Sequence, residues 1–146
     1  MAKADVEMET NILQRREALL TSLKGIKDKD ERLRYIVDEG KSMLPFPDNL
    51  RLDPFLVKGC ISKAWLVPSI KDEKLHFMAD SEAMIVKGIV ALLLRVYNGS
   101  TASEILNLST DFLSEAGVSE HLSMNRRNGL ANILTMIQHY AKTMQK

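Results

Sequence analysis

The chain has 146 residues, of which 45% are hydrophobic and 27% are charged, a composition typical of one globular domain of ordinary size. Its 20 basic residues barely exceed its 19 acidic ones, so it lacks the positive excess that binding to phosphate backbones rewards, and we expect no nucleic-acid partner. The single cysteine excludes an internal disulfide and leaves a free thiol, which favours a reducing compartment, by default the cytoplasm.

The N-terminal segment "MAKADVEMET" lacks the apolar stretch of a signal peptide and is too acidic for a transit peptide. The most apolar run, residues 83–97, is shorter than the roughly 20 residues that span a bilayer, and it contains Lys87 and Arg95. We therefore expect no membrane segment. Because no repeat, low-complexity tract or linker divides the chain, residues 1–146 are predicted to form one domain.

The first two predicted elements are helices. Apolar residues recur at helical spacing over residues 12–23, and Gly25 follows as a stop. Asp28, followed three residues later by Glu31, is typical of a capping box at the start of a second helix. Apolar spacing extends this second helix to Met43, and the two prolines that follow end it.

A β-hairpin and a buried helix come next. The runs "CISKAWLV" (residues 60–67) and "LHFMA" (residues 75–79) are predicted strands, separated by the polar turn "KDEK". The large ring of Trp65 is expected to pack into the core. Residues 84–97 are apolar almost all round, which indicates a helix buried in the middle of the fold, and Asn98-Gly99 ends it.

The C-terminal third is predicted to be helical. Thr101 to Glu104 fits a capping box for a short helix, and a second short helix spans residues 111–116 before Gly117 breaks it. Ser123 is a natural N-cap for the last helix, whose apolar stripe runs to Met144. The chain therefore reads as an α+β domain, with a small antiparallel sheet packed against several helices.

Most site chemistries lack the residues that they need. The one cysteine and the three histidines, His76, His121 and His139, are not paired at the spacing of metal ligands. The glycines form neither of the phosphate-binding loop patterns, so no nucleotide is indicated. A hydrolase with Cys60 as nucleophile and His121 as base would need a convergence of the two side chains that sequence does not establish.

Cys60 has two interpretations. Free cysteine is among the most buried residue types, which favours a role in the core. Gly59 directly before it favours a thiol presented on a loop, because glycine permits turn conformations and the close approach of another molecule. If Lys58 and Lys63 lie near the sulfur of Cys60, they raise its thiolate fraction. The alternative is that both lysines are solvated surface charges.

Three segments, "VKGCISKAWL", "MADSEAMIVKGIVALLLRVYNG" and "EHLSMNRRNGLANIL", resemble the signature blocks of the SufE family of sulfur acceptors, which includes the similar CsdE proteins. Family members typically show "GCxSxVW", "ADSDAxIVKG" and "HLSxxRxNGL" in this order and at similar spacing. The resemblance spans residues 33–137 and is specific because the three blocks occur in combination.

This resemblance implies an α+β fold and a sulfur carrier rather than an independent enzyme. Cys60 would accept sulfur from the active-site persulfide of a pyridoxal-phosphate-dependent, SufS-type cysteine desulfurase. The carrier would stimulate that enzyme and pass the sulfur to an iron-sulfur scaffold complex. It would need no cofactor and no metal of its own.

The resemblance also assigns residues to a partner interface, namely Gly59, Ser62, Asp80, Glu82, His121 and Arg126. Asp80 and Ser81 have a second interpretation as caps of the following helix. Arg126 falls in a first helical turn, where the helix dipole disfavours a cation, so a specific contact is the more plausible reason for its place. Four residues depart from the family pattern, namely Phe55, Ile61, Glu82 and Met124.

Two other classes of protein remain to be compared with the carrier. A scaffold that assembles iron-sulfur clusters needs several thiolate ligands, which one cysteine does not supply. The alternative is a helical adaptor that activates its partner allosterically and whose Cys60 is structural. The reactivity of Cys60 in the folded protein separates this adaptor from the carrier.

Overall fold

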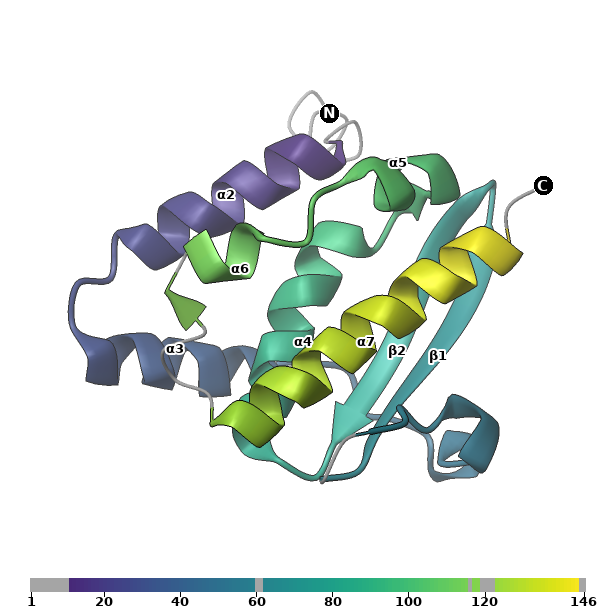
Figure 1. Cartoon of the computed structure of the whole chain (residues 1–146), viewed down its shortest axis with the longest axis horizontal. Helices are drawn as coiled ribbons and strands as arrows, with labels where there is room; N and C mark the ends of the chain where they lie inside the picture. The colour runs from purple at the N-terminus through teal and green to yellow at the C-terminus, as the bar shows by residue number, and fades with distance from the viewer. Residues whose placement is uncertain (1–10, 60–61, 116, 119–122, 145–146) are drawn as a thin grey trace.

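The computed structural model describes residues 11–59, 62–115, 117–118 and 123–144. Within these residues the fold is α+β, as predicted, with a three-stranded antiparallel sheet and helices against it (Figure 1). The helices are α2 (Ile12–Lys24), α3 (Lys29–Lys41), α4 (Met84–Tyr97), α5 (Ala102–Asn107), α6 (Phe112–Glu115) and α7 (Met124–Thr143). The strands are β1 (Ala64–Lys71), β2 (Lys74–Ser81) and β3 (Ser100–Thr101), and two short 3-10 helices, η1 (Asp48–Leu50) and η2 (Asp53–Phe55), precede them.

The sheet confirms the predicted hairpin. β1 and β2 pair along their whole length, and the turn residues Asp72 and Glu73 both have positive φ, at 53° and 66°. Such a two-residue turn matches the twist of the flanking strands. β1 begins at Ala64, and Ser62 and Lys63 before it are not in the strand. The predicted start of the strand at Cys60 was therefore too early. β3, which pairs with the start of β2, was not predicted because two residues carry no alternation pattern.

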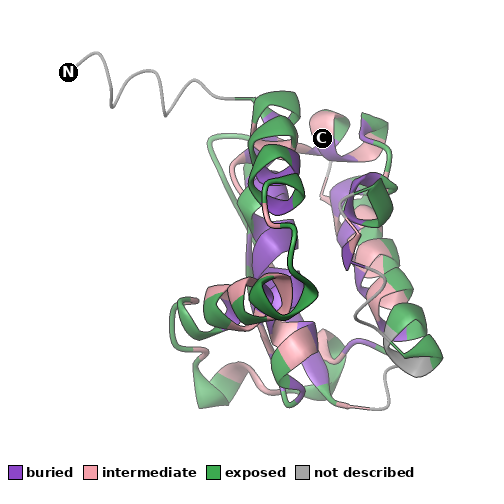
Figure 2. Ribbon diagram, turned by 90° about the vertical axis from the view of Figure 1, so that its left-hand side faces the viewer, coloured by how far each residue is buried: buried purple, intermediate pink, exposed green. Residues whose placement is uncertain are grey.

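Alternation along β2 separates the two faces of the sheet. Leu75, Phe77 and Ala79 are buried, whereas His76 and Met78 between them are exposed. α4 and α7 pack against the buried face, and α2 and α3 pack on α4, so that α4 lies in the middle of the fold (Figure 1). Buried residues accordingly gather between the layers, and exposed residues cover the outer surfaces (Figure 2).

The helix starts follow their sequence signals. Asp28 accepts a hydrogen bond from the backbone N–H of Glu31 at 3.0 Å, which confirms it as the cap of α3. The second bond of the predicted capping box, from the Asp28 N–H to the Glu31 side chain, is not formed between these two described residues. α3 ends at Lys41, so the predicted extension to Met43 was wrong. Met43 still packs against the core from the segment after the helix, which explains why its spacing looked helical.

The central helix α4 confirms the prediction of a buried helix. Ten of its residues are buried, and Asn98-Gly99 follows its end as predicted. The Asn98 side chain accepts a hydrogen bond from the N–H of Phe77 at 2.8 Å, so it ties the helix end to β2. Gly99 has a φ of +81°, a conformation that side chains disfavour. Among the described helices, none combines the length and the hydropathy that crossing a bilayer requires.

The C-terminal elements also follow their signals. Thr101 and Glu104 form both hydrogen bonds of the predicted capping box at the start of α5. α6 occupies the predicted second short helix, and Gly117 after it has a φ of +79°. Ser123 directly precedes α7, and its carbonyl accepts the first helical hydrogen bond, from Arg127, at 2.9 Å.

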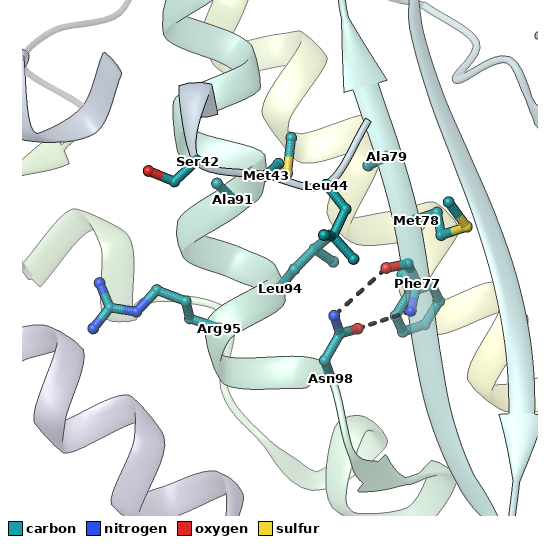
Figure 3. Close-up of a pocket in the computed structure, with 10 residues that line it drawn as sticks. All are labelled: Ser42, Met43, Leu44, Phe77, Met78, Ala79, Ala91, Leu94, Arg95 and Asn98. Carbon is teal, nitrogen blue, oxygen red and sulfur yellow. Dashed lines mark hydrogen bonds between the residues drawn. The ribbon is translucent and has the colours of Figure 1, made fainter. Parts of the chain in front are cut away.

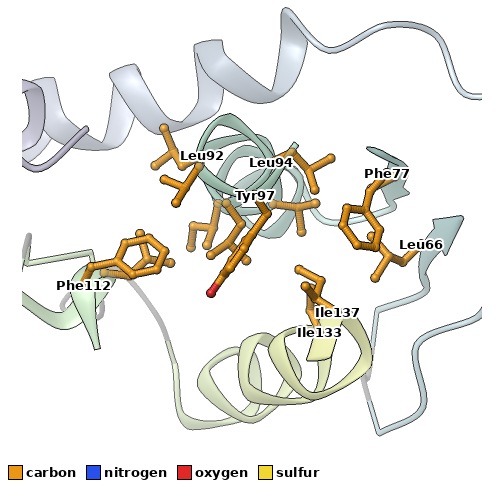
Figure 4. Close-up of a cluster of buried hydrophobic side chains, with 14 of the residues drawn as sticks. Leu66, Phe77, Leu92, Leu94, Tyr97, Phe112, Ile133 and Ile137 are labelled. Atoms are coloured by element: carbon orange, nitrogen blue, oxygen red, sulfur yellow. The ribbon is translucent and has the colours of Figure 1, made fainter. Parts of the chain in front are cut away.

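Tyr97 carries a buried hydroxyl without a hydrogen-bond partner among the described residues. Its side chain is 1% exposed, and its ring makes an edge contact with Phe112 at 6.1 Å between centroids. Ile133 and Ile137 of α7 lie near it in the same cluster (Figure 4). Burial raises the pKa of Tyr97 to about 12, because the tyrosinate would be a charge without water.

Replacing Tyr97 with phenylalanine is therefore expected to stabilise the fold by about 1 kcal/mol, since it removes an unsatisfied buried hydroxyl. The gain should grow with pH. The unfolded tyrosine ionises near pH 10, whereas the folded one does so near 12, so the native protein loses stability over this interval and Tyr97→Phe does not. Urea denaturation should show roughly 1 kcal/mol of further advantage at about pH 11 compared with about pH 8. A destabilised variant at both values would show that the hydroxyl has a partner.

Candidate functional site

The segment that contains Cys60 is a short loop before β1. The backbone N–H of Val57 donates to the carbonyl of Ala64 at 2.8 Å, which closes a loop over residues 58–63. A bridge between Leu56 and Trp65 continues this pairing one residue further out. Cys60 itself, with Ile61, lies outside the described residues. What the structure defines is how the two ends of the loop are held.

Gly59 fixes the first end of the loop. It has a φ of +85° and packs against the side chain of Asn132 on α7. A Cβ atom at this position would overlap Nδ2 of Asn132 and lie 3.2 Å from its Cγ. The left-handed backbone conformation favours glycine at this position. It confirms the turn geometry for which the sequence singled out Gly59, whereas the close approach of another molecule stays a prediction.

Lys63 fixes the second end, through the segment that joins β2 to α4. Glu82 exchanges two hydrogen bonds with its backbone, donating its N–H to the Lys63 carbonyl at 2.9 Å and accepting from the Lys63 N–H at 3.3 Å. The Ser81 hydroxyl donates to the same carbonyl at 3.1 Å. Ser62, between Lys63 and the undescribed residues, is half-buried. Ser81 and Glu82, which belong to the second signature block, thus anchor the loop at Lys63.

The predicted capping of α4 by Asp80 and Ser81 was wrong. Ala83 occupies the N-cap position of α4, and no side chain among the described residues forms a cap hydrogen bond there. The buried Ser81 hydroxyl accepts instead from the N–H of Ala83 itself, at 3.2 Å. Asp80 points elsewhere. Its carboxylate lies 2.6 Å from Nη1 of Arg51 and 3.2 Å from Nζ of Lys87.

Asp80 and Trp65 face each other across the hairpin on the outer face of the sheet. The Arg51 guanidinium lies over the Trp65 ring, 5.0 Å from its centroid, and over the Phe46 ring at 5.1 Å. Trp65 is buried as expected, but by this cover on the outer face and not by the main core. The reason is the strand register, which places the alternating neighbours Ala64 and Leu66 inward instead.

The ion pairs set the charge state of Asp80. Burial alone would raise the pKa of its carboxyl group, but hydrogen bonds from Arg51, Lys87 and the Ser81 backbone hold that pKa below its ordinary value. The carboxylate therefore stays charged at neutral pH. It joins the segment before β1 to the first turns of α4.

Replacing Asp80 with asparagine is expected to lower the free energy of unfolding by about 1 kcal/mol at neutral pH, because the isostere keeps the shape but loses both ion pairs. Because the folded pKa is depressed, this contribution is present above about pH 4 and is lost as the pH falls through the folded pKa. Urea denaturation at pH 7 and pH 3 measures it. Asp48→Asn is the matched control, since Asp48 pairs with the same Arg51 but its side chain is 95% exposed. Equal losses for both variants would contradict the account.

Two grooves lie near these elements. The first, with a volume of about 500 Å³, separates the segment before the loop from α7 and is lined by Pro54, Leu56, Lys58, Asn132, Thr135, Met136, His139 and Tyr140. The second, of about 440 Å³, lies between α4, the segment after α3 and β2 (Figure 3). Asn98 closes one end of it through its hydrogen bonds to Phe77. Only the first groove borders the loop, through Lys58 and Asn132.

The remaining predicted site residues lie in and before α7. His121 is outside the described residues, and Arg126 falls in the first turn of α7, as predicted, with a side chain that is not described. Sequence reasoning missed Arg51 and Asn132. Arg51 lies in an irregular stretch without periodicity, whereas Asn132 belongs to the third signature block but carries no signal of its contact with Gly59.

The fold matches that of a solved protein. The solution structure of a hypothetical protein from Thermus thermophilus superimposes with a TM-score of 0.75 at 19% sequence identity, over 88% of this chain and 94% of that one. This likeness establishes the architecture, an α+β domain with a small antiparallel sheet.

The sequence establishes the family. The family described as "SufE: Fe-S metabolism associated domain" matches residues 17–141, so the chain belongs to the SufE family. An uncharacterized SufE-like protein of Synechocystis sp. is 34% identical over 81% of this chain and 74% of its own length. Another, from Rhizobium meliloti, is 36% identical over 77% of this chain and 84% of its own.

A plant relative shares the same region within a longer protein. The "SufE-like protein 1, chloroplastic/mitochondrial" of Arabidopsis thaliana is 32% identical over 88% of this chain and 34% of its own length. Membership of the family implies a role in Fe-S metabolism and sulfur transfer, as a carrier or activator rather than a catalyst of the usual kind.

Proposed function

We propose that this chain is a sulfur acceptor that takes persulfide sulfur from a SufS-type cysteine desulfurase onto Cys60. In this proposal it stimulates the desulfurase and delivers the sulfur for iron-sulfur cluster assembly. The observation that carries the proposal is the anchored loop of residues 58–63. The only cysteine of the chain falls in a segment closed between Val57 and Ala64 and held by α7 on one side and by the β2–α4 junction on the other.

The transfer step is an exchange between sulfur atoms. The Cys60 thiolate attacks the outer sulfur of the desulfurase persulfide, a bond forms between these two sulfurs, and the bond to the donor cysteine breaks. The donor leaves as a thiolate, and Cys60 carries the persulfide. No electron is gained or lost overall, so this step asks for no oxidant, reductant or cofactor in this chain. The pyridoxal phosphate belongs to the desulfurase.

The surroundings suit this chemistry. Only about 3% of an unperturbed thiol is ionised at neutral pH, so nearby positive charge helps the attack. The exposed Lys58 and Lys63 flank the loop in sequence on either side of Cys60. Because its one cysteine is a free thiol, which suits a reducing compartment, we place the working protein in the cytoplasm as a single domain. A persulfide is easily reduced there, so we expect the carrier to shelter it in an apolar pocket and to expose it only to its partners.

The desulfurase is proposed to contact the loop and its anchors, through Gly59, Ser62, Asp80, Glu82, His121 and Arg126. Gly59 and Glu82 are exposed, so both are accessible to a partner. The charge of Asp80 is already compensated by Arg51 and Lys87, so Asp80 would contribute by shaping the surface. An iron-sulfur scaffold complex would receive the sulfur at the same face after the desulfurase has left.

Replacing Arg126 with alanine is expected to weaken binding to the desulfurase by about tenfold, since arginine residues often dominate interface energies. The melting temperature should stay within about 1 °C, because the helix dipole disfavours a cation in a first helical turn, so its removal costs little stability. Lys142→Ala, in the last turn of the same helix, is the control and should leave the affinity unchanged. Calorimetric titration measures both. Unchanged affinity for Arg126→Ala with a clear drop in melting temperature would make Arg126 structural.

The proposal is tested by incubating the protein with a SufS-type desulfurase and cysteine and then measuring its intact mass. We expect an increase of one or more sulfur atoms, reversed by a reducing agent, together with faster release of alanine. Faster alanine release without any gain of mass would favour the allosteric adaptor instead. An unchanged mass and an unchanged rate of alanine release would reject both functions.

A further inference from the structure

We propose that Asn132 of α7 is a positioning residue for sulfur transfer, which holds the Cys60 loop in register through its contact with Gly59. The inference rests on the proposed function, because it assigns Asn132 a role in the rate of that transfer. It adds a residue of α7 that lies within the third block but outside its family pattern "HLSxxRxNGL".

The contact between α7 and the loop is made by the amide end of the Asn132 side chain. A Cβ atom at Gly59 would overlap Nδ2 of Asn132 and lie 3.2 Å from Cγ and 3.7 Å from Oδ1. The amide end of Asn132 therefore approaches Gly59 with Nδ2 foremost. Because Gly59 precedes Cys60 in the sequence, this contact acts next to the proposed sulfur acceptor.

The main core fixes the part of α7 that carries Asn132. Its neighbour Ile133 is 1% exposed and Ile137, one turn further on, is fully buried, so both anchor this part of α7 in the main core. Asn132 itself is half-buried, between the core and the loop. The core therefore fixes the backbone of Asn132, and the side chain of Asn132 fills the space beside Gly59.

The other described contacts of the loop are made at its base and at its far end, whereas Asn132 contacts it from α7. The Val57–Ala64 hydrogen bond closes the base of the loop, and Glu82 holds its far end at Lys63. On the α7 side, the groove of about 500 Å³ lies next to Asn132 and Lys58. Truncation of Asn132 would open the space under Gly59 into this groove, which gives the loop room to shift.

Such a shift matters because transfer between two sulfur atoms needs an aligned approach. A misplacement of about 1 Å in a reacting group can cost up to about a hundredfold in rate. A displaced loop is expected to slow the transfer step within the complex, while the affinity for the desulfurase stays unchanged. The positioning role therefore predicts a slower maximal rate of transfer with the same concentration dependence.

The test mixes persulfidated desulfurase with increasing concentrations of this protein, quenches with an alkylating reagent and follows the intact mass. We expect Asn132→Ala to lower the maximal rate of transfer by about tenfold or more, with the half-saturating concentration within about twofold of the native value. Asn132→Leu, which has the same branching and the same number of side-chain heavy atoms but no hydrogen-bonding group, should restore the rate to within about threefold. Gly59→Ala, which disturbs the same contact from the loop side, should be as slow as Asn132→Ala.

Thr135→Ala is the matched control, because Thr135 lines the same groove and its hydroxyl donates to the carbonyl of Ala131 within α7, at 3.0 Å. It should transfer sulfur at the native rate. A native maximal rate for Asn132→Ala, or a loss confined to the half-saturating concentration, would overturn the positioning role alone. A native protein that takes up no sulfur would overturn the proposed function and this inference together.

Discussion

Replacing Cys60 with serine is expected to abolish sulfur transfer while leaving the fold and the affinity for the desulfurase intact. Serine has nearly the same shape, but its hydroxyl is far less acidic than a thiol and is a poor nucleophile toward sulfur. The chain has no second cysteine that could take over. The loss should therefore be complete, with no sulfur added to the variant at any incubation time.

The Cys60→Ser variant is measured by intact mass and by alanine release in the same reaction, with circular dichroism and calorimetric titration as controls for fold and binding. It should bind the desulfurase as the native protein does and should no longer accelerate the release of alanine. If the variant stimulated the desulfurase fully, the carrier mechanism would be wrong, and the allosteric adaptor with a structural Cys60 would replace it.

Replacing Gly88 with alanine is expected to destabilise the protein by about 3 kcal/mol or more, although the same change within most helices is favourable by about 0.5 to 1 kcal/mol. The reason is the crossing of α3 and α4. A Cβ atom at Gly88 would overlap the carbonyl oxygen of Ile36 and lie 2.7 Å from its carbonyl carbon. A Cβ atom at Gly40 would in turn lie 2.8 Å from the Gly88 nitrogen. Backbone atoms of α3 and α4 meet on both sides, so rotating a side chain does not relieve the overlap.

A displacement of α4 by Gly88→Ala should also disturb the Cys60 loop. α4 begins directly after Ser81 and Glu82, whose hydrogen bonds hold Lys63, so a displaced α4 carries the loop anchor with it. Urea denaturation and a thermal melt measure the loss, which corresponds to about 10 °C for a domain of this size.

Gly25→Ala is the matched control for this substitution, because Gly25 has an ordinary helical φ of −70° after α2 and its nearest neighbours are the carbonyls of its own preceding turn. It should change the free energy of unfolding by less than about 1 kcal/mol. Equal stabilities for Gly88→Ala and the native protein would show that α3 and α4 can separate without cost.

Local signals account for the parts of the fold that the sequence predicted. The hairpin follows from alternating runs around a polar turn, and the buried α4 follows from a run that is apolar all round. The caps at Asp28 and Thr101 need only residues within one helical turn. In each case the information lies within a few residues, which is the range over which periodicity and capping act.

Contacts between distant segments account for what the sequence did not predict. Met43 has helical spacing because it packs on the core, yet α3 has already ended at Lys41. β3 exists because Asn98 and Gly99 bring the chain back to the start of β2. These outcomes depend on where the chain returns, and short windows of sequence do not contain that information.

The candidate site divides in the same way. The resemblance to the family identified Gly59 and Glu82, and the structure explains the local role of each at one end of the loop. Neither Arg51 nor Asn132 was foreseen, because each acts on a segment far away in the sequence, Arg51 on Asp80 and Asn132 on Gly59. The roles of Cys60, His121 and Arg126 stay predictions.

The most direct test of the account locates the transferred sulfur within the chain. The protein is incubated with a SufS-type desulfurase and cysteine labelled with heavy sulfur, alkylated, digested and sequenced by tandem mass spectrometry. The account predicts that the labelled sulfur is found on the peptide that contains Cys60, as an alkylated persulfide at that residue. Desulfurase activity that leaves Cys60 as an ordinary alkylated thiol, with no labelled sulfur on the peptide, would contradict it.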